Sequence, residues 1–400
     1  MRLSTYCWCA LLASCSSTSP TTGEGGAGGT SASGGEGGHV FGTSDGGSGG
    51  ETATQGGAAN GGFAGGSGAL GGSSASGAGG NSAGGGSGGA TQLTGIQIQG
   101  RTLLVDGAAY HIQGVDWNPV AKGKSQPADY VGLAPVDIPL MQAAGINTVR
   151  TYAPLLDVNV LDSLHAAGIR VLNGVYSYGG DPASAVTERI NAVKAHPAIL
   201  GWVVGNEWNY NGLYVNLSAA DAQARVNEVA TLIKMADATH PVISVYGEVP
   251  STAVLGALPN IDIWGINAYR GISFGDLFTV WQGRSTKPMF LSEYGADAYN
   301  ANLPGYDPTS QALADKALTQ ELLDHSSART QNGVTLGGTI FEWADEWWKA
   351  GNPSTQEVGG SAPGGGPYPD QTFNEEYWGI VDVDRHPRAA YMELAKLFGH

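Results

Sequence analysis

Eight short apolar segments alternate with helical patterns along residues 95–400, and they predict an α/β fold that closes into a (β/α)8 barrel, or TIM barrel. Most of these segments are continuously apolar, as expected for parallel strands that are buried on both faces. An open doubly wound sheet is the alternative. That fold needs a glycine-rich phosphate-binding turn after its first strand, and "GVDWNPV" at residues 114–120 is not such a turn.

The expected elements follow one another in the order of a barrel. A small hairpin around residues 105–107 leads to a first strand that ends near Asp116. Further strands are expected at 146–152, 169–176, 199–205, 241–247, 261–269, 288–295 and 336–343. Helices are expected at 134–145, 159–168, 182–196, 218–239, 274–284, 309–330 and 387–398, several of them with a capping residue or a terminal Gly.

The first 94 residues have a different character. Residues 1–15 are predicted to be a lipoprotein-type signal peptide, because a short apolar run follows Arg2 and Leu12-Ala13-Ser14-Cys15 resembles a bacterial lipobox. In that interpretation Cys15 carries the lipid; an ordinary secretory signal with an incidental Cys is the alternative. Residues 16–94 are rich in Gly, Ser and Ala and are predicted to form a disordered linker. We therefore expect an exported lipoprotein of the outer membrane or cell surface, or alternatively a secreted protein.

Composition excludes several classes of function. The three cysteines are Cys7, Cys9 and Cys15, so residues 95–400 can hold neither a disulfide nor a cysteine nucleophile. No residue cluster has metal-ligand spacing, and we expect no catalytic metal and no cofactor, although a structural Ca²⁺ is left open. The formal net charge of −16 argues against nucleic acid as a partner, and it suits a neutral substrate. The membrane is expected as a partner only through the lipid, and the protein is expected to be a monomer.

Polar and aromatic residues gather where the expected strands end. In a parallel barrel the carboxyl ends of all strands meet at one end, which is where the active sites of such barrels lie. A barrel with a purely structural role has no reason to collect these side chains there. The strand-end residues are Asp116, Trp117, Asn118, Arg150, Tyr152, Tyr176, Asn206, Glu207, Trp208, Tyr246, Asn267, Tyr269, Glu293, Tyr294, Glu342 and Trp343.

Two of these residues, Glu207 and Glu293, indicate a specific chemistry. They end the fourth and the seventh strand, so in a ring of eight strands they face each other across one opening. Paired carboxylates flanked by aromatic side chains are typical of glycoside hydrolysis, in which one group is protonated and the other is charged.

The sequences around the two glutamates resemble those of a known group of enzymes. "GWVVGNEWN" and "KPMFLSEYGAD" are similar to the two signatures of the clan A glycoside hydrolases, which are retaining barrel enzymes. "GVDWNP" and "IDIWGINAY" resemble both the family 2 catalytic barrel and, more loosely, the family 72 β-1,3-glucanosyltransferases. "GGTIFEWADEWW" and the segment up to "RAAYMEL" look most like the end of a family 2 barrel.

The resemblance implies a role for several residues. Glu207 would be the general acid/base, Glu293 the nucleophile, and Asn206 the partner of the sugar 2-hydroxyl. Tyr269 would donate to Glu293, Arg150 would lie beside it, and Trp343 would form the floor of the sugar site. Burial and the charge of Glu293 should raise the pKa of Glu207. The remaining expected substrate-binding residues are Asp116, Trp117, Tyr176 and Trp208, and Glu342, Asp345 and Glu346 are left open between loop charges and sugar ligands.

The sequence thus predicts a retaining glycoside hydrolase that cleaves β-glycosidic bonds in a β-glucan or a related polysaccharide by double displacement. The first alternative is a β-glucanosyltransferase, which would use the same residues for transglycosylation. A non-catalytic carbohydrate-binding barrel is an alternative of another class, but such a protein has no need of both carboxylates. The sugar, its linkage, and internal versus terminal cleavage stay open.

Overall fold

The computed structural model describes residues 95–358 and 366–399. The expected signal peptide, the lipid site at Cys15 and the linker lie outside these residues. Within them, eight parallel strands form a closed barrel in the order β10-β13-β4-β5-β6-β7-β8-β9, so the predicted fold class is confirmed. The barrel strands are β4 (Ile112–Asp116), β5 (Thr148–Arg150), β6 (Arg170–Tyr176), β7 (Ile199–Val204), β8 (Val242–Gly247), β9 (Ile263–Asn267), β10 (Met289–Tyr294) and β13 (Thr335–Ile340).

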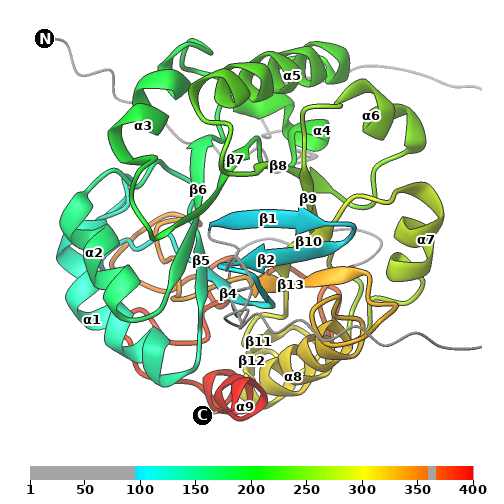
Figure 1. Cartoon of the computed structure of the whole chain (residues 1–400). Coiled ribbons are helices and arrows are strands. Elements are labelled where there is room, and N and C mark those ends of the chain that lie inside the picture. The colour runs from blue at the N-terminus through cyan, green and yellow to red at the C-terminus, as the bar shows by residue number, and fades with distance from the viewer. Residues whose placement is uncertain (1–94, 359–365, 400) are drawn as a thin grey trace, which may run out of the picture. The chain divides into compact units, whose positions relative to one another are not determined.

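Helices surround this ring of strands (Figure 1). Several of them begin at side-chain caps: Asp129, Asp157, Ser218 and Asp307 each accept a hydrogen bond from a backbone N–H of the first turn. The helices are α1 (Tyr130–Ala143), α2 (Val158–Ala166), α3 (Ala185–Val193), α4 (Trp208–Asn211), η1 (Gly212–Tyr214), α5 (Ala219–Ala236), α6 (Thr252–Ala257), α7 (Leu277–Arg284), α8 (Pro308–Asp324) and α9 (Ala389–Phe398). The sequence did not indicate α4, η1 or α6, which are short, and α1 begins earlier than expected.

A small antiparallel sheet precedes the barrel. The expected hairpin is part of a sheet of β1 (Ile96–Gln99), β2 (Thr102–Val105) and β3 (Ala108–Ala109). Leu103 and Val105 of β2 pack with apolar side chains of the barrel strands, among them Leu172 and Phe290. In Figure 1, β1 and β2 lie across the ring of strands, so this sheet covers the amino-terminal end of the barrel.

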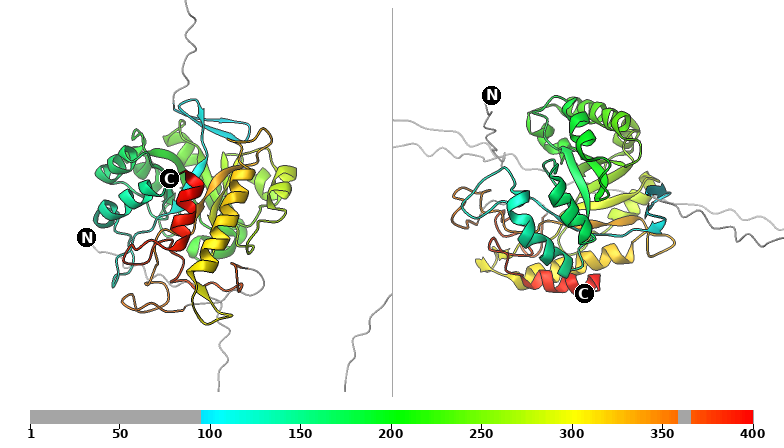
Figure 2. Two further views of the ribbon diagram at one scale, coloured as in Figure 1. Left: turned by 90° about the horizontal axis from the view of Figure 1, so that it is seen from below. Right: turned by 60° about the vertical axis from the view of Figure 1, so that its left-hand side comes forward.

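The opposite end of the barrel carries the long connections. One of them contains the short strands β11 (Tyr299–Asn300) and β12 (Gly305–Tyr306), and another joins β13 to α9. Figure 2 (left) shows α8 and α9 side by side, with the β1–β2 hairpin at one end of the molecule and these connections at the other. No described helix has the length and apolar character needed to span a lipid bilayer.

Candidate active site

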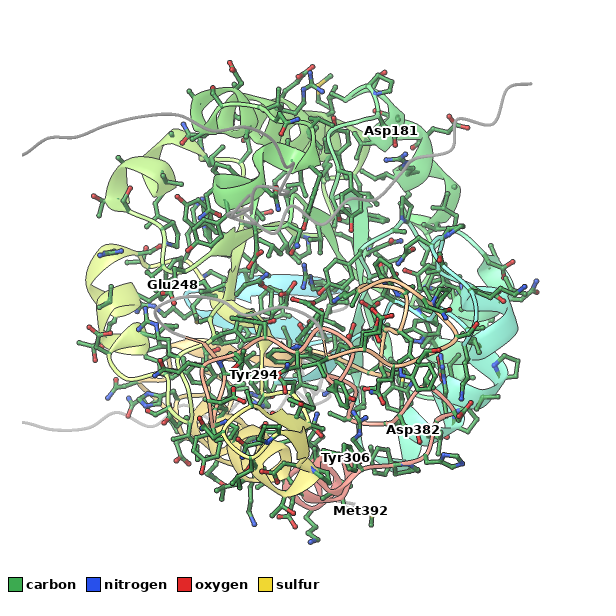
Figure 3. The ribbon with its side chains drawn as sticks, turned by 180° about the vertical axis from the view of Figure 1, so that it is seen from behind. Asp181, Glu248, Tyr294, Tyr306, Asp382 and Met392 are labelled. Carbon is green, nitrogen blue, oxygen red and sulfur yellow. The ribbon has the colours of Figure 1, made fainter. Side chains whose placement is uncertain are left out.

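The carboxyl ends of the barrel strands bring three segments together. Arg150 is the last residue of β5, Glu293 is the second-last residue of β10, and Asn206 and Glu207 follow β7 directly. Figure 3 shows the molecule from the side opposite to that of Figure 1, and Tyr294, the neighbour of Glu293, is labelled near the middle of that view. All three segments come from strands that are buried, so the positions of these side chains are fixed by the barrel core.

A tight turn after β7 places Asn206 and Glu207. Gly205 has a φ of +72°, and Glu207 itself has a φ of 47°, in the left-handed region that non-glycine residues rarely adopt. The backbone oxygen of Glu207 accepts from the amides of Tyr210 (2.8 Å) and Asn211 (3.1 Å), and the Asn211 side chain donates to the backbone oxygen of Asn206 at 2.7 Å. Strain of this kind is typical of functional positions that the surrounding structure holds in place.

The turn leads to a testable consequence for Gly205. A Cβ at this position would lie 2.5 Å from Cδ1 of Trp208, in addition to the cost of the positive φ. Gly205→Ala should therefore lower the free energy of unfolding by about 2–4 kcal/mol, measured by urea denaturation. Gly168→Ala is the control, because Gly168 has a φ of +78° but no atom within 4 Å of the added Cβ. Equal losses in the two variants would show that Trp208 moves aside at little cost.

Arg150 connects the two glutamate-bearing strands. Its Nη1 lies 3.0 Å from Asp116 Oδ1, 3.0 Å from Glu293 Oε1 and 2.8 Å from the backbone oxygen of Ser292, and its Nη2 donates to Asn206 Oδ1 at 2.6 Å. The side chain of Arg150 is only 1 % exposed. Burial lowers its pKa, but the negative charges around it outweigh burial, so the pKa lies well above the usual value and Arg150 is a permanent cation.

Glu293 is surrounded by hydrogen-bond donors. In addition to Arg150, the hydroxyl of Tyr152 donates to its Oε1 at 2.7 Å, and the hydroxyl of Tyr269 donates to its Oε2 at 2.9 Å. Three donors on two oxygens form the hydrogen-bonding pattern of an ionised carboxylate. Glu293 is thus held in place and oriented as a negatively charged group.

Glu207 differs from Glu293 in its environment. Burial raises the pKa of Glu207 to about 7, and the negative charge of Glu293 acts in the same direction, as expected from the sequence. The hydrogen bond with Asn267 and the charge of Arg150 oppose this shift without cancelling it. Near neutral pH the site therefore holds one carboxyl group that can give a proton and one carboxylate that can attack an electrophile.

Asn206 lies between these two groups. Its Oδ1 accepts from Arg150, and Asn267 Nδ2 is 3.4 Å from the same oxygen, so the Asn206 amide is oriented with its nitrogen outward. That nitrogen donates to the hydroxyl of Tyr214 at 3.2 Å. A hydroxyl of a ligand in this opening would meet an amide donor whose direction is already fixed.

Four expected substrate-binding residues do not line the opening, and these expectations were wrong. Trp117 donates from Nε1 to Asp137 on α1 at 2.9 Å, and Trp208 donates to Ser244 Oγ at 3.0 Å. Both rings are buried in the layer between strands and helices, with 0 % and 2 % exposure. They stabilise the barrel and present no face to a ligand.

Trp343 and Tyr176 are likewise packing residues. The Trp343 ring is 1 % exposed and lies 6.4 Å from the ring of Tyr391 on α9, so it cannot form the floor of a sugar site. The Tyr176 hydroxyl donates to the backbone oxygen of Asp181 at 2.8 Å and accepts from Arg225 on α5 at 3.0 Å. Both side chains therefore contact the surrounding helices, Tyr176 through Arg225 on α5 and Trp343 through Tyr391 on α9.

Asp116 lies inside the barrel but acts on Arg150. It is 1 % exposed and binds the guanidinium, so it positions Arg150 and does not meet a ligand directly. Asp345 is also structural, because both of its oxygens pair with Arg388 at 2.6 Å. Glu342 and Glu346 are also buried, and they belong to a charged group with Lys349 and Glu375.

Tyr152, the closest side-chain donor to Glu293, was named from the sequence as a strand-end residue but was given no role. Its position two residues after Arg150 was the available signal, since residues i and i+2 of a strand lie on the same face. Tyr178 and Tyr214 were also missed; their rings lie 4.9 Å apart and form an aromatic wall beside Asn206. Among the described residues, no group of three His, Cys, Asp or Glu side chains is arranged to hold a metal ion.

Comparisons with known proteins show the family and the fold of the chain. Residues 181–399, more than half of the chain, match the model of the family described as "Glycosyl hydrolases family 2, TIM barrel domain". A 1,3-beta-glucanosyltransferase of Saccharomyces cerevisiae is 27 % identical over 294 residues, which cover 63 % of this chain and 56 % of the yeast protein. A beta-glucuronidase of Mus musculus is 25 % identical over 269 residues, covering 60 % and 39 % respectively.

A solved structure shows the same fold. The GH2 beta-galacturonidase from Eisenbergiella tayi, bound to galacturonate, superposes with a TM-score of 0.55 at 20 % identity, over 76 % of this chain and 53 % of that protein. The chain spans about half the length of the yeast relative and less of the mouse one.

Proposed function

The chain belongs to the TIM barrel domain family of the family 2 glycosyl hydrolases, and from this we propose that it is a retaining β-glycosidase acting on a β-glucan or a related polysaccharide. The observation that carries the proposal is the position of Arg150, which binds Glu293 at 3.0 Å and Asn206, the neighbour of Glu207, at 2.6 Å. One guanidinium thus links the two carboxyl-bearing segments, and the raised pKa of Glu207, about 7, supports its proposed role as the acid of double displacement.

The proposed reaction has two steps. In the first, an oxygen of Glu293 attacks the anomeric carbon while the bond to the leaving oxygen breaks, and Glu207 gives its proton to that oxygen. The glycosyl group is then an ester of Glu293. In the second step the Glu207 carboxylate takes a proton from water, the water oxygen attacks the anomeric carbon, and Glu293 is released as a carboxylate. Asn206 would donate to a sugar hydroxyl next to the reacting carbon.

Transfer to a second sugar is the alternative outcome of the same chemistry. Tyr210 and Tyr214 follow Glu207 closely in sequence and are 66 % and 45 % exposed. Exposed tyrosine rings beside the acid/base offer a stacking surface for an acceptor sugar, which would then replace water in the second step. The name of the yeast relative, a glucanosyltransferase, agrees with this alternative.

The test uses the full-length protein with soluble β-glucans, mannan, xylan and galactan. Proton NMR of the first product should show the β anomer before mutarotation, and chromatography should show either shortened chains or chains longer than the substrate. A first-formed α anomer would exclude the retaining mechanism. Longer chains would identify a transferase.

The pH dependence of kcat/KM follows from the state of Glu207. Its pKa is raised to about 7, and the protonated form is the one that acts as acid, so the rate should be full below this value and fall as the pH rises through it. Glu207→Gln should remove this alkaline limb when the substrate has a good leaving group such as 2,4-dinitrophenolate. An unchanged limb in that variant would assign the titration to another group.

The two tyrosines on Glu293 allow a further prediction. Tyr152→Phe and Tyr269→Phe each remove one hydrogen bond to a charged oxygen, and each should lower kcat/KM about 10- to 100-fold. The two oxygens are different, so the double variant should lose more than either single one. Tyr299→Phe is the control, since Tyr299 contacts the ring of Tyr377 away from Glu293. A loss of less than about twofold in both single variants would contradict the role of these donors.

The location of the protein is a separate proposal that rests on the sequence alone. We propose that the chain is exported and anchored by a lipid on Cys15, with residues 16–94 as a linker. Cys15→Ser should then move the activity from the membrane fraction to the soluble fraction.

A further inference from the structure

A group of charged residues borders the catalytic residues. The connection after β13 carries Lys349, whose Nζ lies 2.9 Å from Glu346 Oε2 and 3.2 Å from Glu375 Oε2. Asn118 Nδ2 donates to the other oxygen of Glu346 at 2.6 Å, and the Lys349 ammonium stands 4.4 Å from the centre of the Phe341 ring. We call Glu342, Glu346, Lys349 and Glu375 the acid–lysine cluster.

The acid–lysine cluster adjoins the proposed active site on two sides. The Phe341 ring beneath Lys349 lies 6.4 Å from the ring of Tyr269, which in turn donates to Glu293. Glu375 is among the charges that act on Glu207, and Lys349 is among those that act on Tyr214. A sugar held between Glu207 and Glu293 would therefore lie in the electrostatic field of the cluster.

The lysine of the cluster is already neutralised. Burial lowers the pKa of Lys349, but its carboxyl neighbours outweigh burial and raise it, and the ion pairs with Glu346 and Glu375 hold Lys349 as a cation. Burial, reinforced by Glu346, raises the pKa of Glu342 well above its usual value, which makes Glu342 the uncharged member. Glu346 and Glu375 then leave the cluster with a net negative charge.

Arg150, the cation beside Glu293, is also occupied. It binds Asp116, Glu293 and Asn206 and is almost fully buried. A sugar carboxylate in this opening would meet two cations that already pair with carboxyl groups, and it would lie near the further acidic side chains Glu346 and Glu375. An uncharged hexose, in contrast, can donate from a hydroxyl to Glu375, whose side chain is 32 % exposed.

We infer that the acid–lysine cluster makes the site selective for sugars without a carboxylate and excludes uronates. This inference rests on the proposed glycosidase function and specifies its substrate class. The inferred substrate class differs from the uronides in the names of the mouse beta-glucuronidase and the beta-galacturonidase from Eisenbergiella tayi.

The test compares substrates that differ only at C6. The full-length protein is assayed with the p-nitrophenyl β-glycosides of glucose, galactose and mannose and with the three corresponding uronides. For the sugar that is cleaved best, kcat/KM should favour the uncharged member by about 100-fold or more, as expected for an added like charge in a partly buried site. A wild-type preference for a uronide would overturn the inference and leave the glycosidase function intact.

Variants of the acid–lysine cluster test which of its residues set the preference for neutral sugars over uronates. Glu346→Gln/Glu375→Gln releases Lys349 and should raise the uronide-to-neutral ratio of kcat/KM about 10-fold or more; adding Lys349→Met should reverse this gain. Glu248→Gln is the matched control, because Glu248 is a carboxylate of the same barrel end that pairs with Arg270 and lies toward the edge in Figure 3. An equal rise in the control would show that the general negative charge, and not the cluster, sets the preference.

A binding measurement keeps the inference separate from the proposed function. Native electrophoresis in gels that contain either a neutral β-glucan or polymannuronate reports binding without turnover. If the neutral polymer retards the protein and no substrate is cleaved, the result contradicts the glycosidase proposal and supports the selectivity for sugars without a carboxylate. Stronger retardation by polymannuronate, or retardation by neither polymer, would overturn the selectivity.

Discussion

Glu293→Ala should lower kcat/KM by at least about 10,000-fold, because the proposed nucleophile and the main partner of Arg150, Tyr152 and Tyr269 are lost together. Far-ultraviolet circular dichroism and the urea midpoint would show whether the variant still folds. The residual rate is measured with an aryl β-glycoside and with the best polymer from the substrate panel. A loss of less than about 100-fold would exclude Glu293 as the nucleophile.

Glu207→Ala separates the role of the acid from that of the nucleophile. Without the acid, substrates with poor leaving groups should lose about 100- to 10,000-fold in rate, while 2,4-dinitrophenyl glycosides should lose far less in the first step. Added azide should accelerate the second step of Glu207→Ala and give a β-glycosyl azide, since azide needs no general base. With Glu293→Ala the same anion should give an α-glycosyl azide. Azide products of the opposite configuration would exchange the two assignments.

Glu248→Gln is the control for both variants. Glu248 follows β8 at the same end of the barrel and pairs with Arg270, and it has no contact with Glu207 or Glu293 among its hydrogen bonds. Its rate should stay within about threefold of the wild type, because surface ion pairs contribute little. A large loss in this variant would mean that removal of any carboxylate from this face impairs the enzyme.

The barrel and the two glutamates could be predicted because they depend on few rules. Continuously apolar strands imply burial on both faces, and parallel strands bring their carboxyl ends together. Arg150, Asn206, Glu207, Tyr269 and Glu293 all follow from these rules, and the structure brings all five together. The resemblance in sequence then added a role to each, which the geometry supports and the experiments above test.

The substrate-binding roles predicted for the tryptophans were wrong, and the backbone geometry at the strand ends explains why. Trp117, Trp208 and Trp343 each come one residue after a side chain that faces the opening, namely Asp116, Glu207 and Glu342. Trp117 directly follows the last residue of β4, and alternation along the strand turns it toward the helices. Trp208 is the first residue of α4, after the left-handed Glu207, and Trp343 lies beyond the end of β13, so the turns after these strands set their directions. Proximity in sequence to a strand end was taken as proximity to the site, whereas the backbone conformation at and after the strand end decides which side chains reach the site.

The acid–lysine cluster could not be predicted from the sequence. Lys349 and Glu375 lie 26 residues apart in an irregular connection without periodicity, and only the fold places them 3.2 Å from each other. The same holds for Tyr178 and Tyr214, whose ring contact joins the segments that follow β6 and β7. Contacts between loops depend on where the barrel strands end in space, which a local pattern does not contain.

Arg150 has the largest effect that we expect on stability. Its guanidinium compensates two buried carboxylates, Asp116 and Glu293, whose side chains are 0 % and 8 % exposed. Burial raises the pKa of Asp116, and Arg150 is the main influence that lowers it. Without Arg150, Glu293 would keep only its two tyrosine donors, and Asp116 would lose its cationic partner in a buried position.

Arg150→Met preserves the length of the side chain and removes the charge. Because it leaves two buried carboxylates without a counter-charge, it should lower the free energy of unfolding by about 3–5 kcal/mol, measured by urea denaturation at pH 7. Arg270→Met is the control, since its partner Glu248 is 41 % exposed and such pairs contribute about 0–1 kcal/mol. At pH 4 the loss for Arg150→Met should shrink, because burial raises the pKa of Asp116 and its protonation removes an uncompensated charge. A loss near that of Arg270→Met would show that the buried network contributes orientation to the active site but little net stability.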